Sequence, residues 1–342
     1  MSEYRKDPLT GRWRIIADGR SARPTEYPAV APGADSDPDC PFCEGHETRT
    51  PPESAAIRPT GGRANGPGWT VRAFANKFPS VEPSPSAPSV ASTGSFERLP
   101  GAGVHEVVVL TARHSSCLAE LTSPERQVVF RFLRDRVRTI AHDPSARAVL
   151  LFENRGPESG GTLRHPHVQI VATGPVPPRL AEESRAMRER VSGACRLEPI
   201  VGAEVAARDR ILAEDAHFVA FAPYASEHPY EVWIVPRRHR ATYADATDAE
   251  VDRLSELLPA LLAALAAVRP GASYNWFVHG LSTSAGDGDG FHWHVEVAPR
   301  LVRADGFEVG GGLPVNPVPP ESAAVELRAH LGPTPSPAAR KR

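Results

Sequence analysis

The stretch GGTLRHPHVQIVAT, residues 160–173, places two histidines two residues apart, between a glycine pair and an apolar run. Alternate side chains of a β-strand point to the same face, so we expect His165, His167 and Gln169 to project together from a strand. The glycine-rich loop before that strand offers backbone N–H groups, which can hold an anion. A single histidine in a strand is usually structural, but a pair beside such a loop predicts a site where imidazoles meet a phosphate.

The histidine pair belongs to an internal repeat. Residues 106–125 resemble residues 231–250, and each segment holds a β-rich run, an Arg-His pair and the start of a helix. His165 follows the first Arg-His histidine by 51 residues, and His292 follows the second by 53. This duplication predicts an α+β fold of two tandem units, each an antiparallel sheet carrying helices. The expected segments are a catalytic domain (1–195), a second domain (196–330) and a disordered tail (331–342).

A helix is expected after each Arg-His pair. Thr122 or Ser123 would cap the first helix, and Thr247 would cap the second. Apolar residues then recur near helical spacing, with Val128 among those expected in the buried stripe of the first helix.

The composition narrows the classes of partner. A formal net charge of -2 gives no basic field for nucleic acid or anionic membrane. No run approaches the roughly 20 apolar residues that span a bilayer, and the N-terminus shows no signal peptide. The four cysteines include one Cys-x-x-Cys pair, which in the cytosol more often serves metal or redox chemistry than disulfides. We therefore expect a cytoplasmic protein without nucleic-acid or membrane partners.

Three motifs in this order carry a resemblance to a known family. CPFCEGHE (40–47), RHS (113–115) and HPHVQ (165–169) resemble the galactose-1-phosphate uridylyltransferase family, a branch of the histidine triad superfamily. The resemblance extends from residues 5–24 to residues 306–321, nearly the whole chain. It implies two histidine-triad-like units in one chain and a homodimer that acts on nucleotide sugars and sugar phosphates.

The resemblance implies a covalent mechanism at His167. In the family this histidine attacks the α-phosphorus of a nucleoside diphosphate sugar and releases sugar 1-phosphate. A second phosphate-bearing acceptor then takes the UMP or AMP group. Gln169 matches the glutamine that donates hydrogen bonds to the transferred phosphoryl group. An imidazole suits this role because its ordinary pKa of about 6.5 leaves it neutral near pH 7.

The resemblance also implies two metal sites. The first is a zinc site with ligands Cys40, Cys43, His114 and His165, and His46 is a less favoured substitute. The second, an iron or zinc site, would be held by Glu183, His279, His292 and His294, with Glu182 as the alternative glutamate. From the residues alone, two alternatives stay open: Cys40 and Cys43 are free thiols, and the histidines of the second site form a polar cluster without metal. Cys195 is assigned to neither site.

Substrate contacts are implied at further positions. Arginines that match Arg20 and Arg23 reach phosphates across a dimer interface in the family. Asn76 and Asn154 match positions near the nucleoside and phosphates. The phosphate loop would consist of Ser159, Gly160, Gly161 and Thr162.

The chain departs from the galactose enzymes in two places. Arg164 stands where their loop is small and polar, and the stretch 307–318 has glycines and a proline where polar residues read the sugar. Glu308 and Asn316 are left as candidate hydroxyl contacts. This C-terminal pattern looks more like the branch that transfers an adenylyl group between ADP-glucose and phosphate. Alternatives to uridylyl transfer are therefore a phosphorylase or hydrolase on this scaffold, or a non-catalytic, zinc-stabilised nucleotide-binding protein.

Overall fold

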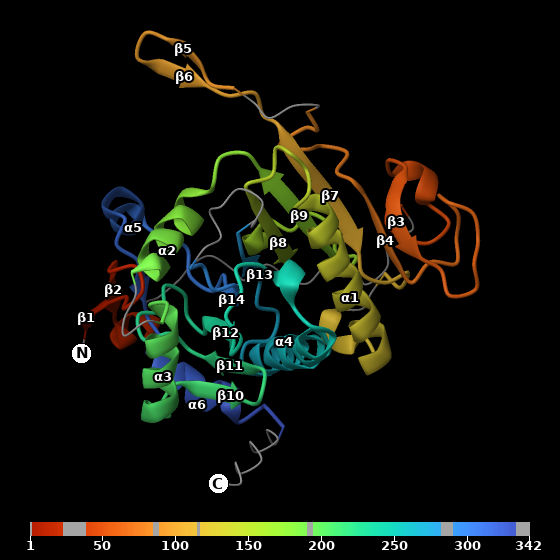
Figure 1. Ribbon diagram of the computed structural model, residues 1–342. Helices are drawn as coiled ribbons and strands as arrows, with labels where there is room; N and C mark the ends of the chain where they lie inside the picture. The colour runs from red at the N-terminus through yellow and green to blue at the C-terminus, as the bar shows by residue number, and fades with distance from the viewer. Residues whose placement is uncertain are drawn as a thin grey trace.

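The computed structural model describes residues 2–22, 39–84, 89–114, 117–189, 194–281 and 290–332 (Figure 1). Its central element is a ten-stranded sheet in which all neighbouring strands are antiparallel. In spatial order the strands are β10 (Ile211–Glu214), β11 (Phe218–Phe221), β12 (Val232–Pro236), β14 (His294–Pro299), β13 (Tyr274–His279), β8 (Ala148–Arg155), β9 (His167–Thr173), β7 (Gly103–Val109), β4 (Val71–Ala75) and β3 (Glu53–Ile57).

The sheet consists of two halves with the same internal order. Read from opposite edges, β3-β4-β7-β9-β8 matches β10-β11-β12-β14-β13. The halves join where β8 pairs with β13, with Phe152 opposite Phe277 and Asn154 opposite Asn275. The expected α+β fold of two tandem units is thus confirmed, and their two sheets form one continuous sheet.

Two long helices, α1 (Ser123–Ile140) and α4 (Asp248–Val268), cover one face of the sheet and pack against each other. Thr122 and Thr247 precede them, and each closes a capping box with the glutamate three residues later. The expected caps are therefore present. The large hydrophobic core lies between these helices and the sheet, but Val128, expected in the buried stripe, is 37% exposed.

The remaining elements surround this framework. A small sheet brings the two ends of the described chain together: β1 (Glu3–Lys6), β2 (Trp13–Ile16) and β15 (Val315–Asn316). The other helices are α2 (Pro178–Arg188), α3 (Leu197–Ala207), α5 (Gly306–Gly311) and α6 (Pro320–Arg328). Short 3-10 turns are η1 (Asp18–Ala22), η2 (Glu47–Arg49), η3 (Leu118–Glu120), η4 (Pro157–Ser159) and η5 (Tyr243–Asp245).

The division expected at residue 195 falls between α2 and α3 and stays a prediction. Most of the expected disordered tail, residues 333–342, lies outside the described residues. None of the helices in the described ranges is both long and apolar enough to cross a bilayer.

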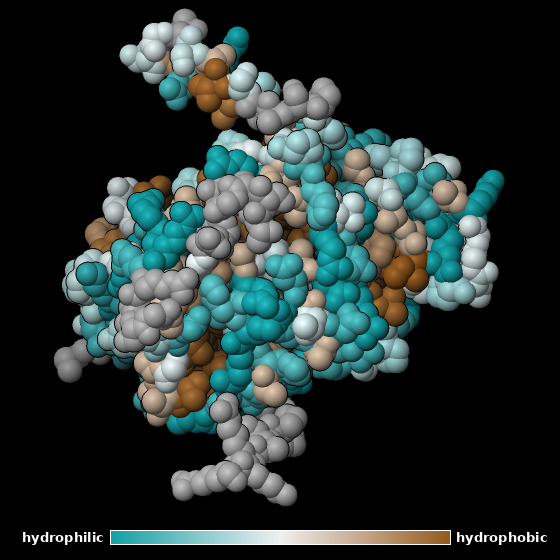
Figure 2. Space-filling model, viewed as in Figure 1, coloured by the Kyte–Doolittle hydropathy of each residue, from teal (hydrophilic) through white to brown (hydrophobic). Residues whose placement is uncertain are grey.

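The hairpin of β5 (Ala91–Thr93) and β6 (Phe96–Arg98) projects from the body of the protein (Figure 1). The face seen in Figure 2 is mainly hydrophilic, and its hydrophobic residues form small separate patches. One patch lies on this hairpin, where Phe96 is 81% exposed.

Glu153 is a buried carboxyl group at the junction of the two halves. It stands on β8 opposite Trp276 of β13, and the indole N–H of Trp276 donates to its Oε2. Burial raises the pKa of Glu153 from 4.5 to about 7. The folded protein therefore keeps a proton that the unfolded chain releases between these pH values. Stability is consequently lost as the pH rises toward about 7.

We expect Glu153→Gln to remove this loss, because glutamine needs no proton and its carbonyl oxygen can still accept from Trp276. The variant should exceed the wild type in unfolding free energy by about 3 kcal/mol at pH 8, and by less than about 1 kcal/mol at pH 5. Urea unfolding at both pH values measures the difference, with Glu97→Gln on the exposed strand β6 as control. An equal difference at the two pH values would contradict the assignment.

Candidate active site

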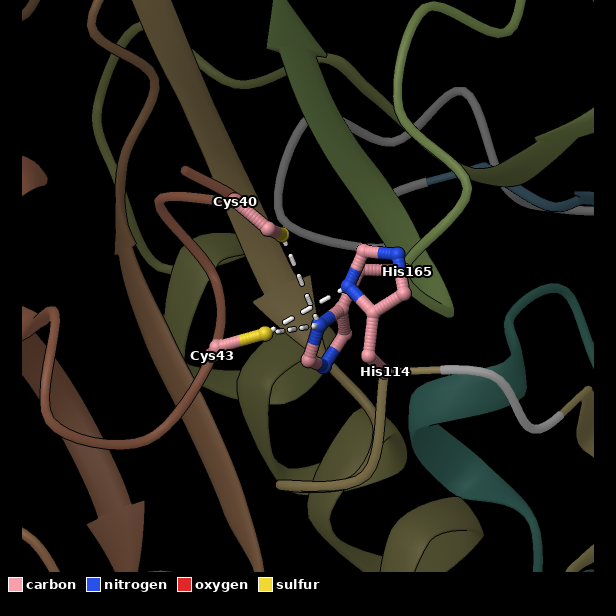
Figure 3. A group of neighbouring side chains, drawn as sticks. All are labelled: Cys40, Cys43, His114 and His165. Atoms are coloured by element: carbon pink, nitrogen blue, oxygen red, sulfur yellow. Dashed lines mark hydrogen bonds between the residues drawn. The ribbon is translucent and has the colours of Figure 1, made fainter. Parts of the chain in front are cut away.

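Two thiols and two imidazoles converge beside the strand that carries His167 (Figure 3). Cys40 and Cys43 come from the N-terminal segment, His114 from the loop after β7, and His165 from the loop before β9. Cys43 Sγ lies 3.3 Å from His114 Nδ1 and 3.6 Å from His165 Nδ1. Cys40 Sγ lies 3.7 Å from His165 Nδ1. The four residues predicted as zinc ligands are therefore brought together.

The donor atoms of this group fit a metal ion. His165 Nε2 lies 2.7 Å from the Thr111 carbonyl oxygen, so Nε2 carries the proton and the Nδ1 lone pair faces the thiols. Tetrahedral zinc–ligand bond lengths would place sulfur and nitrogen about 3.6 Å apart, close to the observed distances. His46 is held elsewhere, since its Nδ1 donates to the Cys40 carbonyl at 2.7 Å.

His167 has one ring nitrogen bound by the backbone and one directed away from it. Nδ1 lies 2.8 Å from the carbonyl oxygen of His165, so Nδ1 carries the proton. The lone pair is then on Nε2, for which the described part of the chain shows no hydrogen-bond partner. Burial lowers the pKa of His167, and the nearby charge of Arg155 lowers it further. The result is a neutral imidazole with a nitrogen available for nucleophilic attack.

The strand β9 begins at His167, two residues later than expected. His167 and Gln169 lie within it, but His165 lies before it and points to the thiols. The expectation that all three share one strand face is therefore wrong for His165. Pro166 between the histidines has no N–H to donate to a strand ladder.

The side-chain carbonyl of Gln169 is held by two neighbours. Its Oε1 lies 2.8 Å from His105 Nε2 and 3.3 Å from Asn76 Nδ2. Because this oxygen is occupied, the amide N–H groups of Gln169 are the part that can donate to a ligand. Asn76, expected near the substrate, therefore lies directly beside Gln169.

Asn154 is held in the same way on the neighbouring strand. Its Oδ1 accepts a hydrogen bond of 2.7 Å from Asn275 Nδ2, which also donates to the Ser159 carbonyl at 3.0 Å. Arg300 Nε in turn donates to Asn275 Oδ1 at 2.7 Å. Two amide groups, those of Gln169 and Asn154, thus have their carbonyl oxygens engaged beside His167.

The expected phosphate loop is a tight turn. A Cβ on Gly161 would lie 2.8 Å from the Asn154 carbonyl oxygen, so a larger residue would displace the loop. Gly156, at φ 85°, lies in the left-handed region and against Ser273. Ser159 Oγ donates to the Gly156 carbonyl at 2.7 Å, so this hydroxyl shapes the loop itself. Gly160 and Thr162 are exposed.

The arginines are distributed differently from expectation. Arg20 is exposed and pairs with Asp305 of the same chain at 3.0 Å, and Arg23 lies outside the described residues. Arg155 is close enough to affect the charge of His167, and its Nη1 donates to the Arg164 carbonyl at 2.9 Å. Arg155 is therefore an arginine, not predicted from the sequence, whose charge lowers the pKa of His167.

The candidate sugar contacts Glu308 and Asn316 are engaged within the protein. Glu308 accepts from the backbone N–H groups of Asp305 and Val315, at 2.9 and 2.8 Å. Asn316 is 1% exposed, and its amide donates to the Ser226 and His228 carbonyls. The expectation of a hydroxyl contact is wrong for Asn316, because its polar atoms are used to hold the loop beneath it.

Strand register relates this site to the second half of the sheet. Gln169 stands opposite Phe152, as Glu296 stands opposite Phe277. His167 therefore corresponds to His294, Gln169 to Glu296, and Asn154 to His279. The same positions hold one imidazole and two amides in one half, and two imidazoles and a carboxylate in the other.

A buried cluster occupies these positions in the second half. Its donor atoms lie within 4.8 Å of one another and belong to Glu183, His279, His294 and Glu296. Burial opposes charge on His294, but hydrogen bonding to Glu296 and the nearby carboxylate charges raise its pKa overall. Two imidazoles and two carboxylates are suitable ligands for iron or zinc. Arg179 contacts the outer oxygens of both carboxylates, at 3.3 Å from Glu183 and 2.5 Å from Glu296.

The expected membership of this cluster is wrong for His292. The structure places His292 with Cys195, Glu198 and His239, and Glu296 completes the cluster in its stead. Cys195 Sγ lies 3.7 Å from His292 Nδ1, and His292 Nε2 contacts the Pro236 carbonyl at 2.7 Å. His292 thus repeats the environment of His165, because both histidines precede their strands by two residues.

Four residues around His167 were missed by the sequence interpretation: Arg155, described above, and Phe42, His105 and Asn275. Phe42 packs edge-on against His167 with ring centroids 5.1 Å apart, and His105 and Asn275 hold the two amides. His105 directly precedes the β-rich run that opens the repeat, which is a signal that it belongs to a strand, but nothing local indicates its partner.

The sequence of the chain is similar to those of known proteins. The family described as galactose-1-phosphate uridyl transferase, N-terminal domain, matches residues 1–177, and a domain of unknown function matches residues 102–332. ADP-glucose phosphorylase of Arabidopsis thaliana is 29% identical over 333 residues, covering 95% of this chain and 92% of its own. Galactose-1-phosphate uridylyltransferase of Thermotoga maritima is 28% identical over 339 residues, covering 96% and 98%.

A solved structure agrees with these relatives. The ADP-glucose phosphorylase of Arabidopsis thaliana with bound ADP-glucose superimposes with a TM-score of 0.79 at 26% identity, covering 96% of this chain and 98% of that chain. The family match extends over more than half of this chain and includes the thiol pair, His114, His165 and His167. The chain belongs to the galactose-1-phosphate uridyl transferase family.

Proposed function

We propose that the protein transfers a nucleotidyl group from a nucleoside diphosphate hexose through a covalent intermediate on His167. The observation that carries the proposal is the hydrogen bond from His167 Nδ1 to the His165 carbonyl, which leaves the lone pair on Nε2. Gln169 and Asn154, whose carbonyl oxygens are engaged, offer amide donors beside this nitrogen. A non-catalytic nucleotide-binding protein would have no need of this arrangement.

The first step forms a bond between His167 Nε2 and the α-phosphorus. The bond from that phosphorus to the oxygen bridging to the β-phosphate breaks, and hexose 1-phosphate leaves with the electron pair. The proton stays on Nδ1 and continues to donate to the His165 carbonyl oxygen, which stabilises the positive charge that the substituted ring acquires. The amides of Gln169 and Asn154 would donate to the non-bridging oxygens, where charge is concentrated.

The second step returns His167 to its starting state. A phosphate oxygen of the acceptor attacks the same phosphorus, the phosphorus–nitrogen bond breaks, and the lone pair returns to Nε2. With hexose 1-phosphate as acceptor, the reaction is the transfer of UMP or AMP between two sugar phosphates. This corresponds to the activity in the name of the Thermotoga maritima relative.

A second candidate uses inorganic phosphate as acceptor, as the name of the Arabidopsis thaliana relative states for ADP-glucose. Asn316 is buried and engaged with backbone carbonyls, and Glu308 accepts from backbone N–H groups. These two side chains therefore do not distinguish the acceptors, and the similarity to this relative over 95% of the chain is what favours phosphate.

The proposal includes metals and an assembly. Zinc at Cys40, Cys43, His114 and His165 would fix the segment from which His167 begins its strand. A second ion, iron or zinc, would occupy Glu183, His279, His294 and Glu296. The protein would be a cytoplasmic homodimer in which Arg20 and Arg23 bind phosphates in the partner's site. Arg20 is exposed, as this role requires, and pairs with Asp305 in its own chain. Light scattering tests the dimer.

A matrix of donors and acceptors distinguishes these functions. UDP-glucose and ADP-glucose are each incubated with galactose 1-phosphate, with inorganic phosphate, or with neither, and glucose 1-phosphate is measured. We expect stoichiometric release without acceptor and many turnovers with one acceptor, whose identity separates the transferase from the phosphorylase. Continuous turnover with water alone would identify a hydrolase. Binding without any release would contradict the proposal and favour a nucleotide-binding protein.

A further inference from the structure

His105 is a buried histidine whose two ring nitrogens both have partners. It lies on β7, next to the strand β9 that carries His167 and Gln169, and it is 8% exposed. Its Nδ1 lies 3.0 Å from the backbone nitrogen of Ser80, and its Nε2 lies 2.8 Å from Gln169 Oε1. The ring therefore bridges a fixed backbone group and the glutamine beside the nucleophile.

The backbone partner determines which nitrogen of His105 carries the proton. The N–H of Ser80 can only donate, so Nδ1 must accept and Nε2 must carry the hydrogen of the neutral ring. This Nε2–H then donates to Gln169 and requires that the atom facing it be the carbonyl oxygen. The Gln169 carbonyl oxygen therefore faces His105, and the Gln169 amide nitrogen faces away from it.

Asn76 supports the same orientation from a second direction. The backbone N–H of Phe78 donates to Asn76 Oδ1 at 2.9 Å, which turns the Asn76 amide toward Gln169 Oε1, 3.3 Å away. Asn76 Nδ2 also lies 3.0 Å from His105 Nε2. With the proton on His105 Nε2, these two nitrogens are both donors, and each donates to Gln169 Oε1 rather than to the other.

The other half of the sheet lacks this arrangement. Val107 stands opposite Gln169 and Trp233 stands opposite Glu296, so the position two residues earlier is His105 in one half and Glu231 in the other. Glu231 accepts from the Trp233 indole N–H at 2.9 Å and from backbone N–H groups. A carboxylate there cannot donate to its neighbour. The donor at position 105 therefore accompanies the nucleophile and the glutamine.

We propose that His105, as its Nε2–H form, is a positioning residue that fixes the amide orientation of Gln169 so that both amide hydrogens point to the transferred phosphoryl group. This rests on the proposed function, in which Gln169 donates to that group. Without the histidine, the amide could rotate by half a turn and present its carbonyl oxygen, which carries a partial negative charge, to the negatively charged phosphate.

Two substitutions separate positioning from packing. His105→Leu keeps bulk but removes the donor, and we expect the rate of His167 labelling to fall by about 10- to 100-fold with KM for the nucleotide sugar changed by less than about threefold. His105→Gln can place an amide N–H near the Nε2 position, and we expect it to stay within about threefold of the wild type. Equal rates for His105→Leu and the wild type would overturn the proposal.

The glutamine background tests whether the effect acts through Gln169. In Gln169→Ala protein, adding His105→Leu should cause no further loss, because the group that it orients is gone. A purely structural role predicts instead the same loss in both backgrounds, together with a lower Tm, and would refute the positioning role.

The tautomers provide a readout that needs no turnover. Nitrogen-15 NMR of histidine-labelled wild type, assigned with His105→Gln and His167→Gly, should show the proton on Nε2 of His105 and on Nδ1 of His167. A proton on Nδ1 of His105 would overturn the positioning role whether or not the protein is active. A wild type with these tautomers that binds nucleotide sugar but never labels His167 would refute the proposed function instead.

Discussion

Replacing His167 with glycine is expected to lower the rate of nucleotidyl transfer by at least about 10⁴-fold. The other histidine of the motif cannot take over, because His165 Nε2 is bound to the Thr111 carbonyl and its Nδ1 faces the thiols. His167 is 8% exposed, so it lies at the edge of the buried interior. Its replacement by glycine should therefore leave a small cavity open to solvent and keep the fold. Release of glucose 1-phosphate in a single turnover measures the effect.

The matched control is His142→Gly, which removes an exposed imidazole just after α1. We expect it to retain wild-type rates. Both variants should unfold at similar temperatures if the loss in His167→Gly is chemical. A His167→Gly protein that keeps more than about one hundredth of the wild-type rate would show that another group is the nucleophile.

Cys43→Ser is expected to remove one equivalent of zinc and to lower Tm by on the order of 10 °C. Cys43 contacts both imidazoles of the thiol–imidazole group, so its loss leaves three ligands and opens the link between the N-terminal segment and His165. Metal analysis of freshly purified protein and thermal unfolding measure the two effects. Because His167 is oriented by the backbone of His165, a fall in activity should accompany the fall in Tm.

Cys117→Ser provides the control for thiol loss. Cys117 caps the short turn η3, and serine can form the same capping contacts. It should keep its zinc content and its Tm. Wild-type protein that contains no zinc, or a Cys43→Ser protein that keeps its full zinc content, would contradict the proposed site.

The duplicated histidine pattern was sufficient to predict the two-unit fold. The meeting of Cys40, Cys43, His114 and His165 was implied by the resemblance of three motifs to the family, and the structure brings these four residues together. The nucleotidyltransferase class follows from the same motifs and agrees with the relatives. The joining of the two sheets at β8 and β13 carries no such signal, because edge pairing depends on which strands are left exposed after each unit folds.

The errors concern contacts that spacing along the sequence does not reveal. Treating His-x-His as a continuous strand put His165 and His292 on the same face as their neighbours, whereas both lie before the strand and turn toward thiols. Cys195, which was assigned to neither site, does lie outside both of them, and its neighbour His292 is 97 residues away in sequence. His105 and Asn275 were missed because their roles depend on contacts across strands, to Gln169 and Asn154.

The measurement that tests the central claim most directly is the intact mass of the protein after incubation with a nucleotide sugar in the absence of acceptor. We predict a mass increase of one UMP or one AMP, located by peptide analysis on His167, stable in alkali and lost in acid or on addition of acceptor. A protein that turns over nucleotide sugar without this adduct, or with the adduct on another residue, would contradict the assignment of His167 Nε2 as the attacking atom.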